Sequence, residues 1–419
     1  LFEAVPRVRL SGRVRGSASP RLPPSQPSPG IGMTVERGPL YVPDGPDADA
    51  VFMAEALRLA ASTPSRPWPN PPVGAVVVRD GRIVGRGAHH GAGTPHAETV
   101  ALAEAGDNAR GATLYVTLEP CNHTGRTPPC APAVAESGVT RVVVAMRDPN
   151  PQVKGGGCRF LRERGLVVNI GTGAAAALEL VWPFAVTEGF QRPFVELKSA
   201  VSLDGRFAPP SSRRRESGPY YLTAEAARCL VHVRRRWSDA VVIGEGTARA
   251  DRPRLDGRLA DGRDGVPAAE PVAVCLDTDL SWSGGLGRAP FLVVAGENAR
   301  RSPNLEAVAA AGGEVVYCRE QGGRLDLHAA LAALHARGLC TLLFEGGPAL
   351  SSALLAAGVV DRWRQFVAPV VLGDGVAWPA GAAPGAAAFT LTRCEAVGPD
   401  AMLVHDRLPF AARLDQVSR

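Results

Sequence analysis

The sequence lacks any apolar run near the roughly 20 residues that a membrane-spanning helix needs, so we expect no membrane partner. It also lacks a regular cysteine pattern, because its eight cysteines lie at irregular spacings in 419 residues, which does not indicate a disulfide framework. A reducing compartment, taken here as the cytoplasm, and a metal site fit this cysteine usage better. Aromatic residues make up only 5% of the chain and are not interleaved with its basic segments, so we expect no nucleic acid partner.

What is present is the composition of a soluble globular protein, with 45% hydrophobic and 21% charged residues. The length predicts two or three domains. The net charge of +5 is a weak signal, because many arginines lie in the N-terminal tail and in one segment near 213–236. That second segment is suited to binding a phosphate locally.

Residues 1–46 are rich in Pro, Ser, Gly and Arg and show no apolar periodicity. Such a composition buries too little surface to offset the entropy of ordering, so we expect a disordered tail. The tail has no apolar segment followed by a small-residue cleavage site, so we do not expect a secretory signal. Because the chain begins with Leu and Met33 lies within the tail, an over-extended gene start is a further expectation.

Residues 47–190 read as a first α/β domain with element order α-β-β-α-β-α-β-α-β, which describes a three-layer sandwich around one mixed sheet. An amphipathic helix ends near Ser62, and Asp80-Gly81 predicts a hairpin turn between two β-branched runs. The later elements are predicted as a helix from His96 to about Ala105, strands at 112–118, 141–146 and 166–170, and helices at 132–138 and after 156.

Residues 182–192 read as a junction, and a second α/β domain is predicted over 191–412 with a mostly parallel sheet. Its predicted segments are a strand from 193, a helix at 224–237, a strand at 240–244, a loop at 245–258, strands at 271–277, 291–296, 314–318 and 340–347, helices at 326–337 and 348–357, and a strand at 361–373.

Four residues point to metal chemistry. His96 is followed two positions later by Glu98, and Cys121 and Cys130 come after the next strand. One imidazole and two thiolates hold zinc tetrahedrally and leave a fourth position for water, whose pKa the metal lowers toward 7. A glutamate beside that water can carry protons to a departing amine, which is the arrangement of the zinc deaminases. Each residue alone is more often an ordinary solvated or buried side chain, but the four in this order favour a metal site.

The segments NPPVGAVVV, GAGTPHAE, YVTLEPCNHTGRTPPC and DPNPQVKGGG resemble the deaminase half of the bifunctional riboflavin-biosynthesis deaminase–reductase family. The two cysteines are separated by the eight residues NHTGRTPP, whereas related deaminases of this fold usually have C-x-x-C. The resemblance implies a cytidine-deaminase-like domain in which zinc is held by His96, Cys121 and Cys130, protons are carried by Glu98, and the substrate is bound by Asn70, His89 and Arg126. His90 and His123 are competing imidazoles, and we interpret His123 as a loop residue near the substrate.

The segments KSAVSLDGRFA, RRRWSDAVVIGEGTARADRPRLDGR and FEGGPALSSALLAAGVVDR resemble the reductase half of the same family. The resemblance implies a dihydrofolate-reductase-like α/β fold that uses NADPH. It places on the cofactor side Lys198, Ala200, Tyr221, Thr223, Thr247, Asp251, Gly346 and Gly347. It places on the ribose-phosphate side Ser217, Arg235, Leu255, Arg258 and Glu345. One departure is RRRESGPYYLT, which is longer than the family pattern and has Tyr221 in place of a tryptophan.

The function implied is a two-step enzyme of riboflavin synthesis acting on a phosphorylated pyrimidine. It would deaminate 2,5-diamino-6-ribosylamino-4(3H)-pyrimidinone 5′-phosphate and then reduce the ribosyl chain to ribityl with NADPH. We also expect a homo-oligomer. Two alternatives stay open at this point: a deaminase whose second domain has lost reduction, motivated by the altered loop, and a deaminase of nucleic acid bases that would show steep salt dependence of binding.

Overall fold

The computed structural model describes residues 46–63, 69–125, 127–150, 153, 156–210, 220–258, 270–379 and 389–408. Its strands form a five-stranded sheet, a nine-stranded sheet and a small two-stranded sheet. No helix among the described residues is both long and apolar enough to cross a membrane. The disordered tail predicted for residues 1–46 lies outside the described residues, apart from Pro46.

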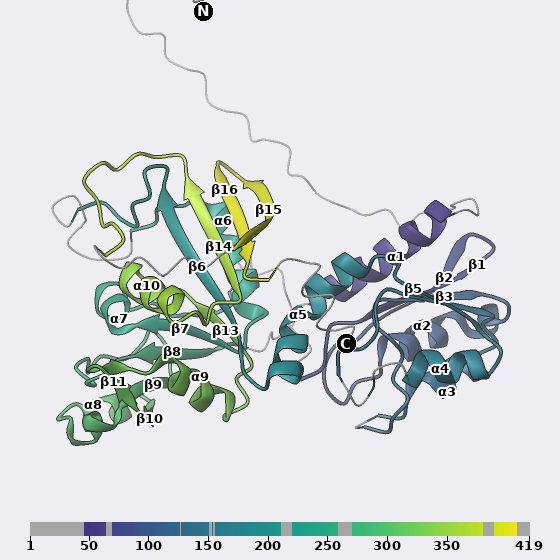
Figure 1. Cartoon of the computed structure of the whole chain (residues 1–419), viewed down its shortest axis with the longest axis horizontal. Helices are drawn as coiled ribbons and strands as arrows, with labels where there is room; N and C mark the ends of the chain where they lie inside the picture. The colour runs from purple at the N-terminus through teal and green to yellow at the C-terminus, as the bar shows by residue number, and fades with distance from the viewer. Residues whose placement is uncertain are drawn as a thin grey trace, which may run out of the picture. The chain divides into compact units, whose positions relative to one another are not determined.

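The first sheet has the strand order β2-β1-β3-β4-β5, in which β1 is antiparallel to β2 and β3, while β3, β4 and β5 are parallel (Figure 1). Helices α1 and α5 pack on one face and α2, α3 and α4 on the other, so the predicted three-layer sandwich is confirmed. The strands are β1 (Gly74–Arg79), β2 (Arg82–Ala88), β3 (Thr113–Val116), β4 (Arg141–Val144) and β5 (Val167–Ile170). The helices are α1 (Pro46–Ala61), α2 (Ala97–Ala105), α3 (Cys130–Glu136), α4 (Gly156–Glu163) and α5 (Ala174–Phe190), with a short 3-10 turn η1 (Gly106–Ala109).

Strand β1 shows why this sandwich forms. Its alternate side chains enter two different cores: Val76 packs with α1 and α5, and Val77 packs with α2 and α3. The turn after it has positive φ at Asp80 and Gly81, as the predicted Asp-Gly hairpin requires. On β2, a Cβ at Gly87 would overlap the carbonyl oxygen of Ala97, so α2 lies directly against the sheet. This contact fixes the start of α2, where the predicted metal ligand is located.

Helix α5 corrects the junction predicted over 182–192. The helix runs unbroken from Ala174 to Phe190 with Pro183 inside it, and only the residues between Phe190 and β6 are connecting chain. Proline disfavours a helix interior, but Trp182 and Val186 are buried in the first core, and burial of this face outweighs that cost.

The second sheet has the order β10-β9-β8-β7-β13-β6-β14-β16-β15 and is parallel from β10 to β14, with β16 and β15 antiparallel. The predicted mostly parallel α/β sheet is therefore confirmed. Its strands are β6 (Phe194–Ser202), β7 (Ala240–Gly244), β8 (Val272–Leu276), β9 (Phe291–Gly296), β10 (Gly313–Cys318), β13 (Thr341–Phe344), β14 (Arg362–Ala368), β15 (Thr390–Val397) and β16 (Asp400–Asp406).

Helices cover both faces of the second sheet (Figure 1). Residues of α9 and α10 pack with Val242 and Phe344 on one face, and residues of α7 and α8 pack with Val241 and Leu343 on the other. Helix α6 packs against β14 and β16. The helices are α6 (Glu225–Arg236), α7 (Glu245–Asp251), α8 (Leu305–Ala310), α9 (Leu327–His335) and α10 (Pro348–Ala356), and a 3-10 turn η3 (Glu297–Arg301) follows β9.

The loop predicted over 245–258 is wrong in its first half, where helix α7 occurs. Only Ala248 of this helix is buried, so its sequence has no apolar periodicity to reveal it. Elements that the sequence patterns did not indicate are α8, β15, β16 and the hairpin of β11 (Glu320–Gln321) with β12 (Arg324–Leu325). In β16 the buried Asp406 pairs with Arg362. Because an acid occupies a buried position, the sequence of this strand does not show the alternation of apolar and polar residues.

Candidate functional site

Three potential metal ligands meet between α2 and α3. His96 is the N-cap of α2, Cys130 is the first residue of α3, and Cys121 lies in the loop after β3. The Nδ1 atom of His96 is 3.1 Å from the Sγ atom of Cys130 and 3.5 Å from that of Cys121. All three donor atoms lie within 4.8 Å of one another. The structure therefore brings the predicted ligand set together.

The donor set fits zinc. Tetrahedral zinc with its usual bond lengths separates a nitrogen and a sulfur ligand by roughly 3.6 Å, close to the observed spacings. A hydrogen bond from the Cys130 thiol lowers the pKa of Cys121 to about 4, and the same bond raises the pKa of Cys130. The two sulfurs thus share a proton that a divalent cation replaces on binding.

Thr127 orients the imidazole. Its Oγ1 atom lies 3.1 Å from Nε2 of His96, so when Nδ1 binds a metal, Nε2 carries the proton and donates it to this hydroxyl. Metal-binding histidines usually donate their second N–H in this way. The sequence analysis did not single out Thr127, because nothing in the spacing of residues shows which oxygen reaches the far side of the ring.

Glu98 lies in the first turn of α2 and is 4% exposed. Burial raises its pKa to about 7, against a smaller lowering by hydrogen bonding to its own backbone and by His96. The backbone N–H groups of the first turn of α2 lower this pKa, but the loss of hydration outweighs them. Glu98 lines the same cavity as His96 and Cys121.

This cavity has a volume of about 360 Å³, large enough for a substituted pyrimidine. Asn70 and His89, which were predicted to bind the substrate, line it. The Nδ1–H group of His89 donates to the carbonyl oxygen of Pro95 at 3.2 Å, so the Asn70 amide donates to Nε2 of His89 at 2.8 Å. Burial lowers the pKa of His89, which keeps the ring neutral and the network in this arrangement.

Asp148 and Asn150 also line the cavity, although only the segment that contains them was noted from the sequence. Asp148 is 7% exposed, and its Oδ1 atom accepts a hydrogen bond of 2.8 Å from the backbone N–H of Asn150. Burial raises the pKa of Asp148 to about 7, and the nearby Glu119 adds to this rise. The signal available in the sequence was an acid that follows a buried strand.

The remaining deaminase predictions divide into three cases. Arg126 lies outside the described residues. His123 is exposed and lines the cavity, in agreement with a loop residue near the substrate. His90 is exposed and does not line this cavity among the described residues.

In the second half of the chain, a bidentate ion pair lies at the centre of the predicted substrate residues. Arg235 of α6 donates from Nε and Nη2 to the carboxylate of Glu345, which follows β13, at 2.7 and 2.9 Å. Burial alone would raise the pKa of Glu345, but attraction by Arg235 outweighs it and lowers the pKa. Lys198 of β6 is close enough to both to interact with them, and burial lowers its pKa.

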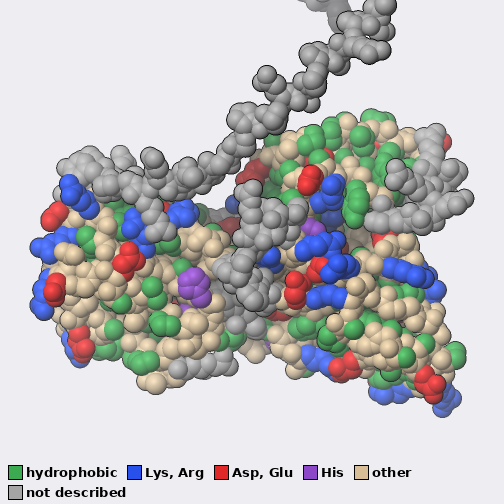
Figure 2. Space-filling model, turned by 180° about the vertical axis from the view of Figure 1, so that it is seen from behind, with side chains coloured by type: hydrophobic (Ala, Val, Ile, Leu, Met, Phe, Trp, Pro, Cys, Tyr) green, Lys and Arg blue, Asp and Glu red, His purple; other side chains and the backbone are tan. Residues whose placement is uncertain are grey.

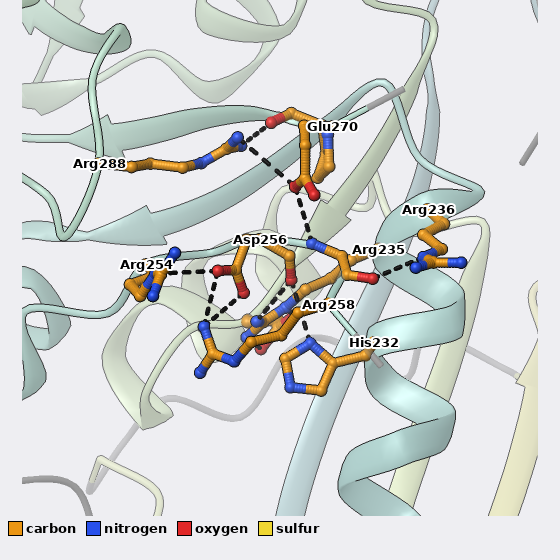
Figure 3. A network of polar contacts seen from close by, with 11 residues as sticks. His232, Arg235, Arg236, Arg254, Asp256, Arg258, Glu270 and Arg288 are labelled. Atoms are coloured by element: carbon orange, nitrogen blue, oxygen red, sulfur yellow. Dashed lines mark hydrogen bonds and ion pairs between the residues drawn. The ribbon is translucent and has the colours of Figure 1, made fainter. Parts of the chain in front are cut away.

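Asp256 connects this pair to other basic side chains (Figure 3). Its carboxylate contacts Arg258 at 2.6 Å and Arg254 at 3.0 Å, while its backbone carbonyl accepts from Arg235 at 3.1 Å. The Nδ1–H group of His232 donates to the same carbonyl at 3.1 Å. The sequence analysis did not predict a role for Asp256 or His232. Neither residue is at one of the positions that most clearly mark the reductase half of the family.

Leu255, which precedes Asp256, is 1% exposed and has a φ of 53°. This left-handed conformation is costly for leucine, and it turns the chain so that the basic side chains on either side gather at Asp256. On the face shown in Figure 2, Lys and Arg side chains lie close to Asp and Glu side chains on the part of the molecule that holds the second sheet.

The Gly346-Gly347 turn leads directly into helix α10. Gly347 is the N-cap of α10, and Pro348 begins the helix, so the free N–H groups of the first turn point out of its end. A Cβ at Gly347 would lie 4.0 Å from Oγ1 of Thr247, and a Cβ at Gly346 would crowd Leu350 at 2.9 Å. A side chain at Gly347 would therefore come into contact with Thr247, and one at Gly346 would have to displace Leu350.

The other predicted cofactor residues are more scattered. Ala200 lies on β6 opposite Phe366 of β14, and Asp251 is the exposed last residue of α7. The Thr223 carbonyl accepts from Arg228, whose guanidinium carbon lies 4.9 Å from the centre of the Tyr221 ring. The Tyr221 side chain is 61% exposed. Ser217 lies outside the described residues.

Comparisons with known protein families match the two halves of the chain separately. A family model described as the cytidine and deoxycytidylate deaminase zinc-binding region matches residues 46–146. A second, the RibD C-terminal domain, matches residues 193–403. Both candidate sites therefore lie in matched regions, except that Asp148 and Asn150 fall just after the first match.

Curated relatives match over most of the chain. The riboflavin biosynthesis protein RibD of Aquifex aeolicus is 37% identical over 79% of this chain and 89% of its own length. RibD of Escherichia coli K12 is also 37% identical, over 78% of this chain and 89% of its own length.

Solved structures also match over most of the chain. RibD of Acinetobacter baumannii has a TM-score of 0.70 at 34% identity and covers 86% of this chain and 99% of its own. A deaminase/5-amino-6-(5-phosphoribosylamino)uracil reductase of Thermotoga maritima has a TM-score of 0.71 at 32% identity, with the same coverage.

Proposed function

We propose which side chains carry out the two reactions of this chain, which belongs to the family of RibD riboflavin biosynthesis proteins. The chain is a bifunctional enzyme with a zinc-dependent pyrimidine deaminase and an NADPH-dependent reductase. It removes the 2-amino group of 2,5-diamino-6-ribosylamino-4(3H)-pyrimidinone 5′-phosphate and then reduces the ribosyl chain to ribityl. The convergence of His96, Cys121 and Cys130 beside the buried Glu98 is the observation that carries the first assignment.

In the deaminase, His96, Cys121 and Cys130 hold zinc, which when bound makes hydroxide available at neutral pH. Glu98 takes the proton from the attacking water and delivers it to the departing amine. Its position on the wall of the cavity, two residues after a zinc ligand, supports this role. Thr127 keeps the His96 ring turned toward the two sulfurs throughout.

The pyrimidine is bound by Asn70 and His89, with Asp148 and Asn150 contributing from the other loop of the cavity. The neutral His89 ring and the amides of Asn70 and Asn150 suit a ring that carries several N–H and C=O groups. Arg126 binds the phosphate of the substrate, because a guanidinium meets a phosphate through two parallel hydrogen bonds.

In the reductase, NADPH supplies the hydride, and the protein positions the two reactants. We assign the cofactor side to Lys198, Ala200, Tyr221, Thr223, Thr247, Asp251, Gly346 and Gly347. We assign the ribose-phosphate side to Ser217, Arg235, Leu255, Arg258 and Glu345. The open turn at Gly347 and the network around Asp256 support these assignments.

We further propose that residues 47–190 and 191–412 are the deaminase and reductase domains, and that the enzyme works in the cytoplasm on a phosphorylated pyrimidine. We also propose a homo-oligomer. Strand β15 supports this, because it is the last strand of its sheet among the described residues and its side chains are mostly exposed. An edge strand of this kind can pair with another chain. Light scattering of the purified enzyme measures its mass in solution.

The deaminase assignment is tested with a Glu98→Gln variant. We expect about one zinc per chain to be retained, while ammonia release falls by a factor on the order of 100 to 10,000. Loss of zinc, or unchanged ammonia release, would reject the role of Glu98. The deaminase-only alternative is tested separately: NADPH consumption with the deaminated ribosylamino-uracil phosphate rejects it, and no consumption at millimolar substrate supports it.

A further inference from the structure

Glu119 is a buried acid that the reactions described above do not use. It lies two residues before Cys121 and is 3% exposed. Its carboxylate accepts two backbone N–H groups from another part of the chain: Oε1 accepts from Cys158 at 2.9 Å, and Oε2 accepts from Asp148 at 3.4 Å. Its own backbone N–H donates to the carbonyl oxygen of Met146 at 3.0 Å.

These contacts join two segments that are distant in the sequence. The first segment carries Cys121, and the second runs from the end of β4 to the start of α4 and carries Asp148 and Asn150 on the wall of the cavity. The Glu119 carboxylate lies between the two ends of the second segment, because Asp148 begins it and Cys158 is in the first turn of α4.

The backbone beside Glu119 is packed equally closely. A Cβ at Gly157 would overlap the carbonyl oxygen of Pro120, so the first turn of α4 lies directly against the residue that precedes Cys121. Cys158 is 1% exposed, and its thiol is not available to solvent. A small shift of either segment would therefore be transmitted to the other.

A carboxylate at this position has an energetic cost. Glu119 is buried close to Asp148, whose pKa it helps to raise, and two buried acids in proximity repel each other when both are charged. A carboxylate offers two acceptor oxygens on one carbon, which a hydroxyl or a single amide oxygen cannot match. Two converging N–H donors account for an acid here in spite of that cost.

We propose that Glu119 is a positioning residue for deamination, which holds the segment of Asp148 and Asn150 at a fixed place relative to the zinc-binding Cys121. The proposal rests on the proposed function of this cavity. Glu119 lines the cavity, and it acts on this segment through the backbone N–H groups of Asp148 and Cys158. Its loss therefore weakens substrate binding more than it slows the chemical step.

The test is a Glu119→Gln variant of the full chain, compared with Glu163→Gln, which changes an exposed acid at the end of α4, the helix whose first turn Glu119 binds. Glutamine keeps the length of the side chain but replaces one acceptor oxygen with an NH₂ group that faces a donor. We expect the KM of deamination to rise about tenfold, with kcat within threefold of the wild type, as for losing one hydrogen bond to a charged acceptor. The control should leave both values unchanged.

Three further measurements keep the result decisive. Zinc content should remain near one per chain, and NADPH oxidation by the same preparation should be unchanged, which shows that the variant is folded. A double variant with Asp148→Asn should have a KM well below the product of the two single effects, because both changes act on one segment.

An unchanged KM, loss of zinc, or an equal fall in both activities would overturn the proposal. A wild-type chain without ammonia release would instead reject the proposed function itself, so the two failures are distinguishable. If the glutamine variant does not accumulate as folded protein, Glu119→Asp provides the second test. Aspartate keeps the charge but is too short to reach both donors, and the same rise in KM is expected.

Discussion

The guanidinium of Arg235 and the carboxylate of Glu345 are joined by two hydrogen bonds of 2.7 and 2.9 Å, although 110 residues separate them in the sequence. Both side chains are largely buried, with 12% and 11% of their surface exposed. Helix α6 supplies one partner and the end of β13 the other. The pair therefore fixes the distance between the basic side chains around Asp256 and the Gly346-Gly347 turn.

Replacement of Glu345 by Gln should impair the reductase specifically. The variant leaves Arg235 with one acceptor in place of two, and we expect NADPH oxidation to fall at least tenfold and the free energy of unfolding to fall by about 2 kcal/mol. Ammonia release from the deaminase should not change. Glu297→Gln is the matched control, because Glu297 pairs with Arg300 at an exposed position and should not alter the melting temperature. Equal loss of both activities would contradict a local role.

Arg258 and Arg254 offer a second comparison within the reductase. Both contact the carboxylate of Asp256, at 2.6 and 3.0 Å, but only Arg258 is assigned to the substrate. Because a guanidinium binds phosphate through charge-assisted hydrogen bonds, Arg258→Ala should raise the KM of the phosphorylated reductase substrate about tenfold. Arg254→Ala should change it less than threefold. Steady-state kinetics of the two variants measures these KM values. Equal effects on the KM would show that the two arginines act only through Asp256.

Thr127→Val should weaken the zinc site without removing a ligand. Valine keeps the shape of threonine but cannot accept the Nε2–H group of His96, so the ring loses the contact that orients it. Changes of this kind usually cost about 10- to 100-fold in metal affinity. Competition with a chromogenic chelator measures the affinity, and Thr124→Val, at an exposed position in the same loop, is the control. If the two variants bind zinc equally well, Thr127 does not orient the ligand.

The sequence predicted the ligands of the metal site but not their support. His96, Cys121 and Cys130 are recognisable because their chemistry and order are unusual together. Thr127 and Glu119 have common side chains whose roles depend on partners that are brought close only by folding. Glu119, for example, binds the backbone of residues 29 and 39 positions away. Backbone partners leave no trace in residue type, so no pattern could have identified this contact.

The fold, too, could be predicted from the sequence only in part. A β-branched run predicted β1, because a strand with two covered faces must be apolar along its length, and Asp80-Gly81 predicted the hairpin turn. Residues 182–192 were predicted to be a junction, yet α5 continues to Phe190 because the side chains around Pro183 are buried. Tertiary packing decided that case, and a local rule cannot include it.

Asp148 predicts a specific pH dependence of stability. Its pKa is raised from 3.8 to about 7 in the folded chain, chiefly by burial, so between these values the folded chain keeps a proton that the unfolded chain has released. The carboxyl therefore contributes fully to stability below about pH 4, and its contribution is lost as the pH rises to 7, by about 4 kcal/mol at most. Other acids, such as Asp49, have lowered pKa values, and their contribution to stability changes with pH in the opposite direction.

The measurement must therefore compare the wild type with Asp148→Asn, which has no titrating group at this position. The difference in free energy of unfolding between variant and wild type should shift in favour of the variant from pH 4 to pH 7, as measured by urea denaturation with zinc held saturating. A difference that stays constant over this range would mean that Asp148 ionises at its ordinary pKa and that the cavity is better hydrated than its burial indicates.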